Sequence, residues 1–173
     1  MHPAIAELDA HRRRFTELTA WLQGADFADE RSWLDETERA RFTRESEDYV
    51  WTKAELEAHV DRVALDHPEL FESWRKRNGL SPRPRPRWRL DRVAHPPRGD
   101  LFELEHRVTW RITEVATGRV VLEVEGSEDA HYEGPGWTPS GEHGVVRVRV
   151  EGNEAVLLLA DGRERRRSLA AQE

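Results

Sequence analysis

The chain contains no cysteine, and among its 27 basic residues only Lys53 and Lys76 are lysines. The lack of cysteine excludes a disulfide framework, a thiolate metal site and a cysteine nucleophile. No apolar run approaches the ~20 residues that span a bilayer. Residues 1–14 also lack the basic stretch and apolar core of a secretory signal. We therefore expect a cytoplasmic protein without a membrane partner.

Motifs with a strong chemical meaning are missing as well. The sequence has no Gly-x-Ser-x-Gly elbow and no glycine-rich phosphate loop, because its Gly-Pro-Gly-Trp segment does not match one. These absences favour a protein that is not an enzyme. The sequence also gives no reason to expect a cofactor, and no spacing of its histidines and carboxylates matches a metal motif.

Residues 1–80 have the apolar spacing of helices. Apolar side chains recur three, four and seven residues apart from Pro3 to Gly24, which is typical of one face of a helix. A second, weakly amphipathic helix is expected from about Ser32. Thr52 and Glu55 match a capping box that predicts a third helix, and a short fourth helix is expected from Pro68. We therefore predict about four helices.

The segment 81–87 reads SPRPRPR, and alternating prolines favour an extended linker. Beyond it, over residues 88–170, the apolar period changes to two, which predicts about six antiparallel strands. The longest runs from Phe102 to Thr113. The order is typical of an α+β fold, and we expect one compact unit in which a curved sheet packs on the helices. Carboxylates on the solvent face are expected to pair with Arg107 and Arg111 across strands.

Charge is strongly segmented along the chain. The net charge is −6 over residues 1–81, +5 over 82–98, −8 over 99–162 and +2 over 163–173, which gives −7 in total. The basic belt around Trp88 contains Arg83, Arg85, Arg87 and Arg89. It can pair with the acidic segments, bind a partner protein, or contact nucleic acid with Trp88 stacked on a base. The acidic total charge disfavours nucleic acid.

His106 is the most informative single residue. Strict alternation along the strand 102–113 puts it on the apolar face, two residues from Val108 and four from Trp110. A buried imidazole needs a hydrogen-bond partner and can serve as a general base. Helical periodicity places His11 in the apolar arc of the first helix and His59 at the edge of the third. A pocket formed by His11, His59, His106 and Trp110 is one hypothesis, and a filled core is the other.

A long polar segment, residues 126–144, is a second candidate site. It carries His131, Trp137 and His143, and Trp137 has few neighbours in sequence to cover it. Because tryptophan is common at interaction hot spots, we interpret this segment as an interaction loop or a mobile surface loop.

Three functional hypotheses follow, and nucleic-acid contact through the basic belt is the least favoured. The first is a non-catalytic protein-interaction, accessory or inhibitor-type protein that acts through its segmented charge. The second is a small-molecule binder or enzyme with a cone-like pocket around His106 and Trp110.

Overall fold

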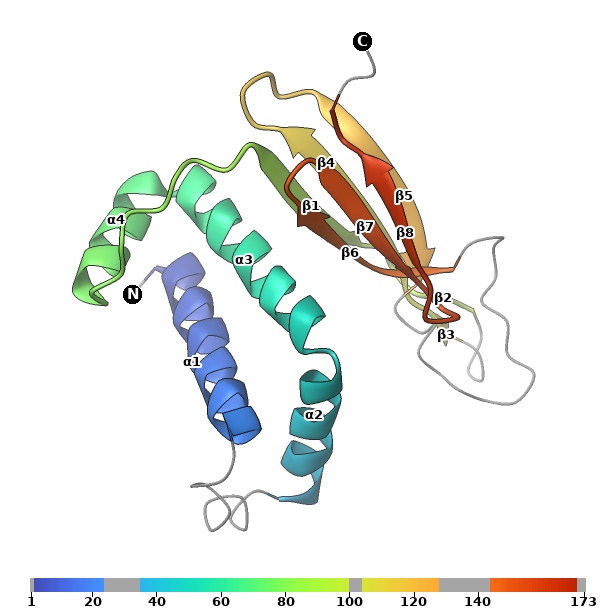
Figure 1. The fold of residues 1–173 in the computed structure, drawn as a ribbon, viewed down its shortest axis with the longest axis horizontal. Coiled ribbons are helices and arrows are strands. Elements are labelled where there is room, and N and C mark those ends of the chain that lie inside the picture. The colour runs from blue at the N-terminus through green and yellow to red at the C-terminus, as the bar shows by residue number, and fades with distance from the viewer. Residues whose placement is uncertain (1, 24–34, 100–103, 128–143, 171–173) are drawn as a thin grey trace. The chain divides into compact units, whose positions relative to one another are not determined.

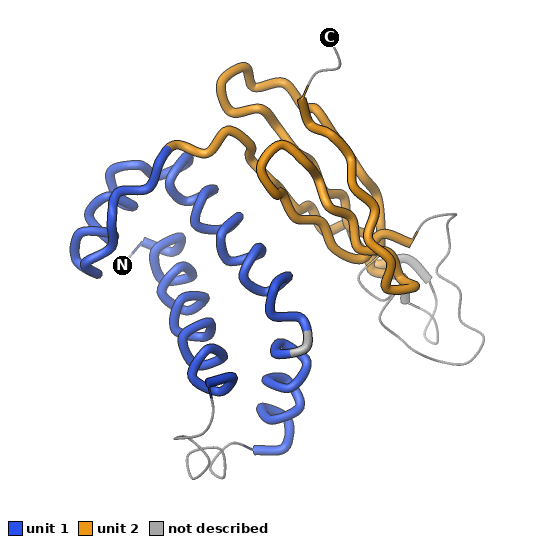
Figure 2. The backbone as a smooth tube through the Cα atoms, viewed as in Figure 1, with its two compact units in different colours: residues 1–84 blue, residues 85–173 orange. Residues whose placement is uncertain are grey.

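The computed structural model describes residues 2–23, 35–99, 104–127 and 144–170. In these ranges the chain forms four helices followed by a six-stranded, mostly antiparallel sheet, which confirms the predicted α+β class (Figure 1). The chain divides into two compact units, residues 1–84 and 85–173, and the boundary falls inside the proline-rich segment 81–87 (Figure 2). The packing of sheet on helices stays a prediction.

The helical unit contains α1 (Pro3–Gln23), α2 (Glu36–Glu47), α3 (Tyr49–Asp66) and α4 (Pro68–Arg77). Proline occupies the first position of α1 and of α4, where its missing N–H costs no helical hydrogen bond. After α4 the chain turns at Gly79, whose φ of 63° lies in the left-handed region that glycine adopts without strain. The predicted starts of α1 and α4, at Pro3 and Pro68, are therefore confirmed.

The start of α3 differs from the prediction. The helix begins at Tyr49, so Thr52 lies inside it and cannot act as its N-cap. Asp48 separates α2 from α3 and serves as the capping residue of both. The Thr-x-x-Glu pattern was misleading because it also occurs within helices, where the backbone N–H groups are already bonded.

Two apolar clusters hold the helices together. In the first, side chains of α1, α3 and α4 bury one another, namely Ile5, Leu8, Val63, Phe71 and Trp74. The second joins α1 to α2 through Leu18 and Phe42. Phe42 is the single large apolar residue that α2 buries, which agrees with its weak amphipathic pattern.

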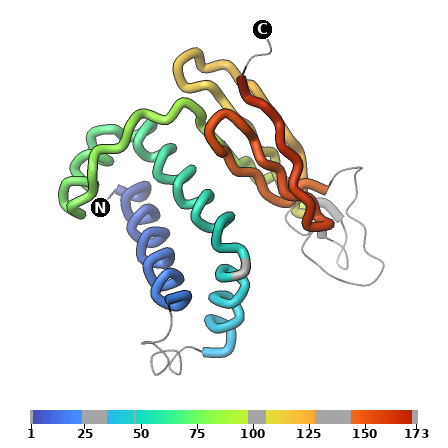
Figure 3. Tube along the Cα trace, in the orientation of Figure 1, coloured from blue at the N-terminus to red at the C-terminus, as the bar shows by residue number. Residues whose placement is uncertain are grey.

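The sheet unit contains one six-stranded sheet in the order β1-β4-β5-β6-β7-β8 and a small pair, β2-β3 (Figures 1 and 3). The strands are β1 (Trp88–Ala94), β2 (Arg98–Gly99), β3 (Leu104–Glu105), β4 (Arg107–Glu114), β5 (Val120–Ser127), β6 (Val145–Glu151), β7 (Glu154–Leu159) and β8 (Glu164–Ser168). All neighbours are antiparallel except β5 and β6. A parallel pair needs a long connection, and the segment 128–143 between them is long enough.

In the β1-β4-β5 part of the sheet, one face is apolar and the other carries charged side chains. Cross-strand partners on the apolar face include Leu90 with Ile112, and the burial of Val108, Trp110 and Ile112 confirms the predicted alternation in this part of the chain. The predicted cross-strand ion pairs are also confirmed, because Arg107 lies 3.0 Å from Glu125 and Arg111 lies 2.8 Å from Glu123. The other face of β4 therefore carries charge pairs on either side of Thr109, which is buried and lies 2.7 Å from a His95 ring nitrogen.

Gly126 sets the contact between β5 and β6. It pairs with Val145, the one register pair between these strands. A Cβ atom at this position would lie 1.9 Å from the Val145 carbonyl oxygen and 2.7 Å from the Trp110 ring. The two halves of the sheet can therefore join only because residue 126 has no side chain.

Candidate functional sites

His106 is not on the buried face, and this corrects the prediction from the sequence. It is exposed and lies between β3 and β4, outside both strands. The expected continuous strand is interrupted at this residue, so the alternation that holds from Val108 onward does not extend to it. Trp110 is 5% exposed and is packed against Gly126. His106 is therefore not a buried histidine beside Trp110, which was the basis of the pocket hypothesis.

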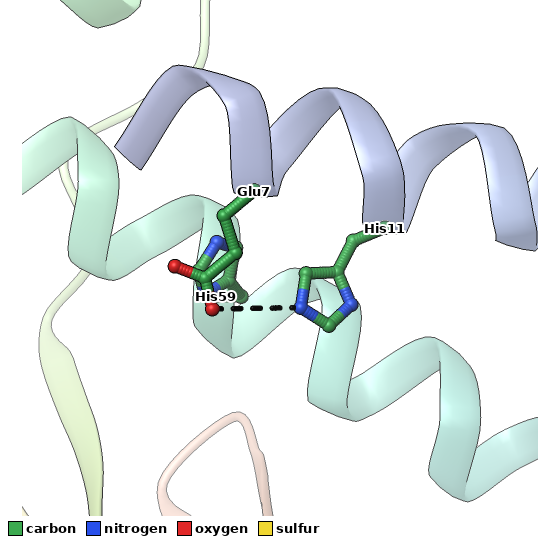
Figure 4. Close-up of side chains that lie close together, drawn as sticks. All are labelled: Glu7, His11 and His59. Carbon is green, nitrogen blue, oxygen red and sulfur yellow. Dashed lines mark ion pairs between the residues drawn. The ribbon is translucent and has the colours of Figure 1, made fainter. Parts of the chain in front are cut away.

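His11 and His59 do come together, although His11 is exposed and does not lie in the apolar arc where helical periodicity placed it. Their ring centroids are 4.7 Å apart, with His11 on α1 and His59 on α3. Glu7 lies one turn before His11 on α1, and its Oε1 atom is 3.9 Å from His11 Nε2. Figure 4 shows both side chains of α1 next to His59. The packing of Leu8 and Val63 between the helices brings the three polar groups to one place.

The environment of His59 differs from that of its two neighbours. His59 is 8% exposed, whereas the side chains of Glu7 and His11 are 61% and 52% exposed. The Nδ1 atom of His59 is 3.3 Å from an Arg62 nitrogen, and its Nε2 atom is buried without a hydrogen-bond partner. Burial lowers the pKa of His59, and the nearby His11 and Arg62 lower it further. The imidazole therefore stays neutral at neutral pH.

Three of the four arginines of the basic belt bind acidic neighbours. Arg83 lies 2.7 Å from Asp61, and Arg89 lies 2.8 Å from Asp91. Arg87 lies 3.6 Å from Glu114, and its guanidinium is 4.7 Å from the Trp88 ring centre. These contacts support the interpretation that the belt pairs with the acidic parts of the chain. Arg85 is exposed.

Trp88 does not present a stacking surface. It is 7% exposed, and its indole nitrogen donates a hydrogen bond to Asn153 in the turn between β6 and β7. A base cannot stack on a ring that is already covered. The other predicted interaction residues, His131, Trp137 and His143, lie outside the described residues.

A more exposed basic surface lies on β8, at one end of the sheet order. All five residues of β8 are exposed. Arg166 binds Glu151 and Glu154 at 2.9 and 3.0 Å. Within the described parts of the chain, Arg165 and Arg167 have no carboxylate partner within 4.0 Å. The sequence indicated this basic segment near the C-terminus but not that it forms the edge of a sheet.

The helical unit also contains a groove of about 460 Å³. Its walls include Leu56, Val60, Leu80 and Pro82, with Arg12 and Arg83 contributing charge. Arg12 donates a hydrogen bond to Asn78, and Arg83 pairs with Asp61. Both cations of this groove are therefore already engaged within the helical unit.

Sequence reasoning missed two kinds of site residue. Glu7 was not considered, although its i,i+4 spacing to His11 places both on one helix face. Arg149 was not considered either, although it alternates with valines along β6. It is 6% exposed and is held by Glu151 at 2.7 Å and Glu164 at 2.8 Å. No pattern in the sequence distinguishes it from Arg147, which alternates with the same valines, because burial depends on which strands flank β6.

None of the helices in the described ranges is both long and apolar enough to cross a membrane. No protein-family model matches the chain, and neither a curated protein nor a solved structure matches it.

Proposed function

We propose that the protein is a non-catalytic interaction protein whose sheet unit binds an acidic, extended segment of a partner protein along β8. The observation that carries the proposal is the Arg-rich edge strand itself, with every residue exposed. Addition of a strand to a sheet edge is a common mode of peptide recognition, in which backbone hydrogen bonds give affinity and side chains give specificity.

The backbone of β8 offers alternate residues to such a partner. Leu159 N–H donates to the Arg163 carbonyl, and Leu169 N–H donates to the Asn153 carbonyl. In an antiparallel pair this pattern repeats every second residue, so the residues at 163, 165 and 167 direct their backbone groups toward β7. The N–H and C=O groups of Glu164, Arg166 and Ser168 therefore point to the outer edge.

The side chains favour an acidic partner. Arg165 and Arg167 lie on one face of β8, opposite Leu157 and Ala155 of β7. Directly opposed residues of neighbouring strands have Cβ atoms about 5 Å apart, close enough for ion pairs. A segment with carboxylates at every second position fits this face. Charge on an edge strand also discourages pairing with a second copy of the same strand, because like charges would be opposed.

The test compares two substitutions at the centre of β8. Arg166→Pro removes one outward N–H without breaking a bond to β7, whereas Arg166→Ala removes the same side chain and keeps the N–H. The tagged full chain and both variants are used to purify partners from the native cell, and a partner recovered with the wild type is then titrated against each. We expect Arg166→Ala to bind and Arg166→Pro to lose most of its affinity.

A charge variant completes the test. Arg165→Glu with Arg167→Glu is expected to abolish binding, whereas Arg13→Glu on an exposed turn of α1 is expected to leave it unchanged. Equal binding by the Ala and Pro variants would refute strand addition. A wild-type protein that remains monomeric and without a partner at native concentration would refute the proposal as a whole.

A further inference from the structure

We propose that Glu7, His11 and His59 form a binding site for a divalent transition metal of the zinc class, which joins α1 to α3. The three side chains are close enough to share an ion. One ligand atom from each lies within 4.8 Å of the others. Two ligands of a tetrahedral zinc ion are about 3.3 Å apart, given bond lengths of about 2.0–2.2 Å.

The ligand atoms must move closer together to bind one ion, and two of the three side chains are free to move. Glu7 and His11 are more than half exposed and lie one turn apart on α1, so a rotamer change brings their ligand atoms closer at little cost. His59 is fixed by burial. The site therefore has a rigid ligand on one helix and two adjustable ligands on the other.

The chemistry of the donors selects the ion. Two imidazoles and one carboxylate are ligands that suit zinc and its neighbours, whereas magnesium and calcium prefer oxygen ligands alone. His59 has a buried Nε2 atom without a hydrogen-bond partner, and such an atom is costly unless something binds it. Its low pKa keeps the ring in the neutral form that coordinates metals. The exposed side of the cluster leaves room for water to complete the coordination.

Arg62 opposes metal binding. Its guanidinium, 3.3 Å from His59 Nδ1, can donate a hydrogen bond there only when Nδ1 carries no proton. A neutral His59 that coordinates through Nε2 must carry its proton on Nδ1, so the guanidinium has to turn away when the ion binds. Removal of the arginine is therefore expected to strengthen binding.

The experiment uses the full chain after treatment with a chelator. Zinc is titrated by calorimetry, and cobalt is added separately, since its absorption spectrum reports tetrahedral coordination by nitrogen and oxygen. We expect one zinc ion per chain at this site, and affinity at least about tenfold lower in His11→Ala and in Glu7→Gln. Both replaced side chains are exposed, so the variants keep the fold.

The matched control is His67→Ala. His67 forms the other close histidine pair of the helical unit, with a ring distance of 4.7 Å to His2, and its loss is expected to leave zinc affinity unchanged. Arg62→Gln is expected to bind zinc more tightly, and an unchanged affinity would overturn Nε2 as the coordinating atom. The site itself is refuted if the wild type does not bind at roughly 100 µM zinc, or if His11→Ala binds as the wild type does.

Discussion

Replacement of Gly126 by alanine tests the junction of the sheet directly. The added Cβ atom would lie 1.9 Å from the Val145 carbonyl oxygen, and contacts below 3.0 Å require something to shift. The strand β6 would have to move by about 1.1 Å, and the ring of Trp110, which is 2.7 Å away, would have to shift as well.

The cost follows from these contacts. Overpacking of a buried site costs about 1–3 kcal/mol, and weakening of the backbone pairing between Gly126 and Val145 adds about 1 kcal/mol. We therefore expect Gly126→Ala to lower the free energy of unfolding of the sheet unit by about 2–4 kcal/mol. Where space allows and φ is negative, a Gly→Ala substitution stabilises a protein by about 0.4–1 kcal/mol. A loss of stability in Gly126→Ala would therefore indicate the steric clash, and a gain would indicate open space.

Denaturant unfolding, followed by circular dichroism in the strand region, measures this effect. The control is Gly118→Ala, because Gly118 has a φ of 71° but a Cβ atom added there would meet no heavy atom within 4 Å. Its cost comes from backbone strain alone, about 1 kcal/mol. If Gly126→Ala is as stable as the wild type, or more stable, β5 and β6 do not approach as described.

Three further predictions concern single side chains. Leu8→Ala removes a fully buried side chain from the α1–α3–α4 cluster, and thermal unfolding should show a loss of about 2–5 kcal/mol. Thr52→Ala should leave the free energy of unfolding within about 0.5 kcal/mol of the wild type, because Thr52 lies inside α3. A larger loss in the same assay would show that Thr52 does cap the helix. Hydrogen bonds from Arg149 and Arg166 lower the pKa of Glu151. The unfolded chain therefore takes up this proton first, and the stabilisation, present above pH 4.5, is lost as pH falls through the lowered pKa. Unfolding measured across this acid range should depend less on pH in Glu151→Gln, and an equal dependence would contradict the assignment.

Periodicity predicted most of the fold because it reflects burial on a single element. A period near 3.6 placed α1, and a period of two placed the apolar face of β4 from Val108 to Ile112. The same rule placed His11 in the apolar arc of α1, but its side chain is 52% exposed, although its ring does lie 4.7 Å from that of His59. It failed at His106, since alternation assumes an unbroken strand and the strand is interrupted there.

The sequence by itself determined the order of elements, the proline-rich boundary and the exclusion of cysteine chemistry, because each depends on residue type or on neighbours along the chain. Only the tertiary structure decided which charged groups are buried, which strand lies at an edge and which side chains meet. Arg149 is covered by the strands beside β6, Arg165 and Arg167 are exposed at the edge on β8, and Glu7 joins the histidine pair through helix packing. These properties depend on neighbours far apart in sequence, which no local pattern encodes.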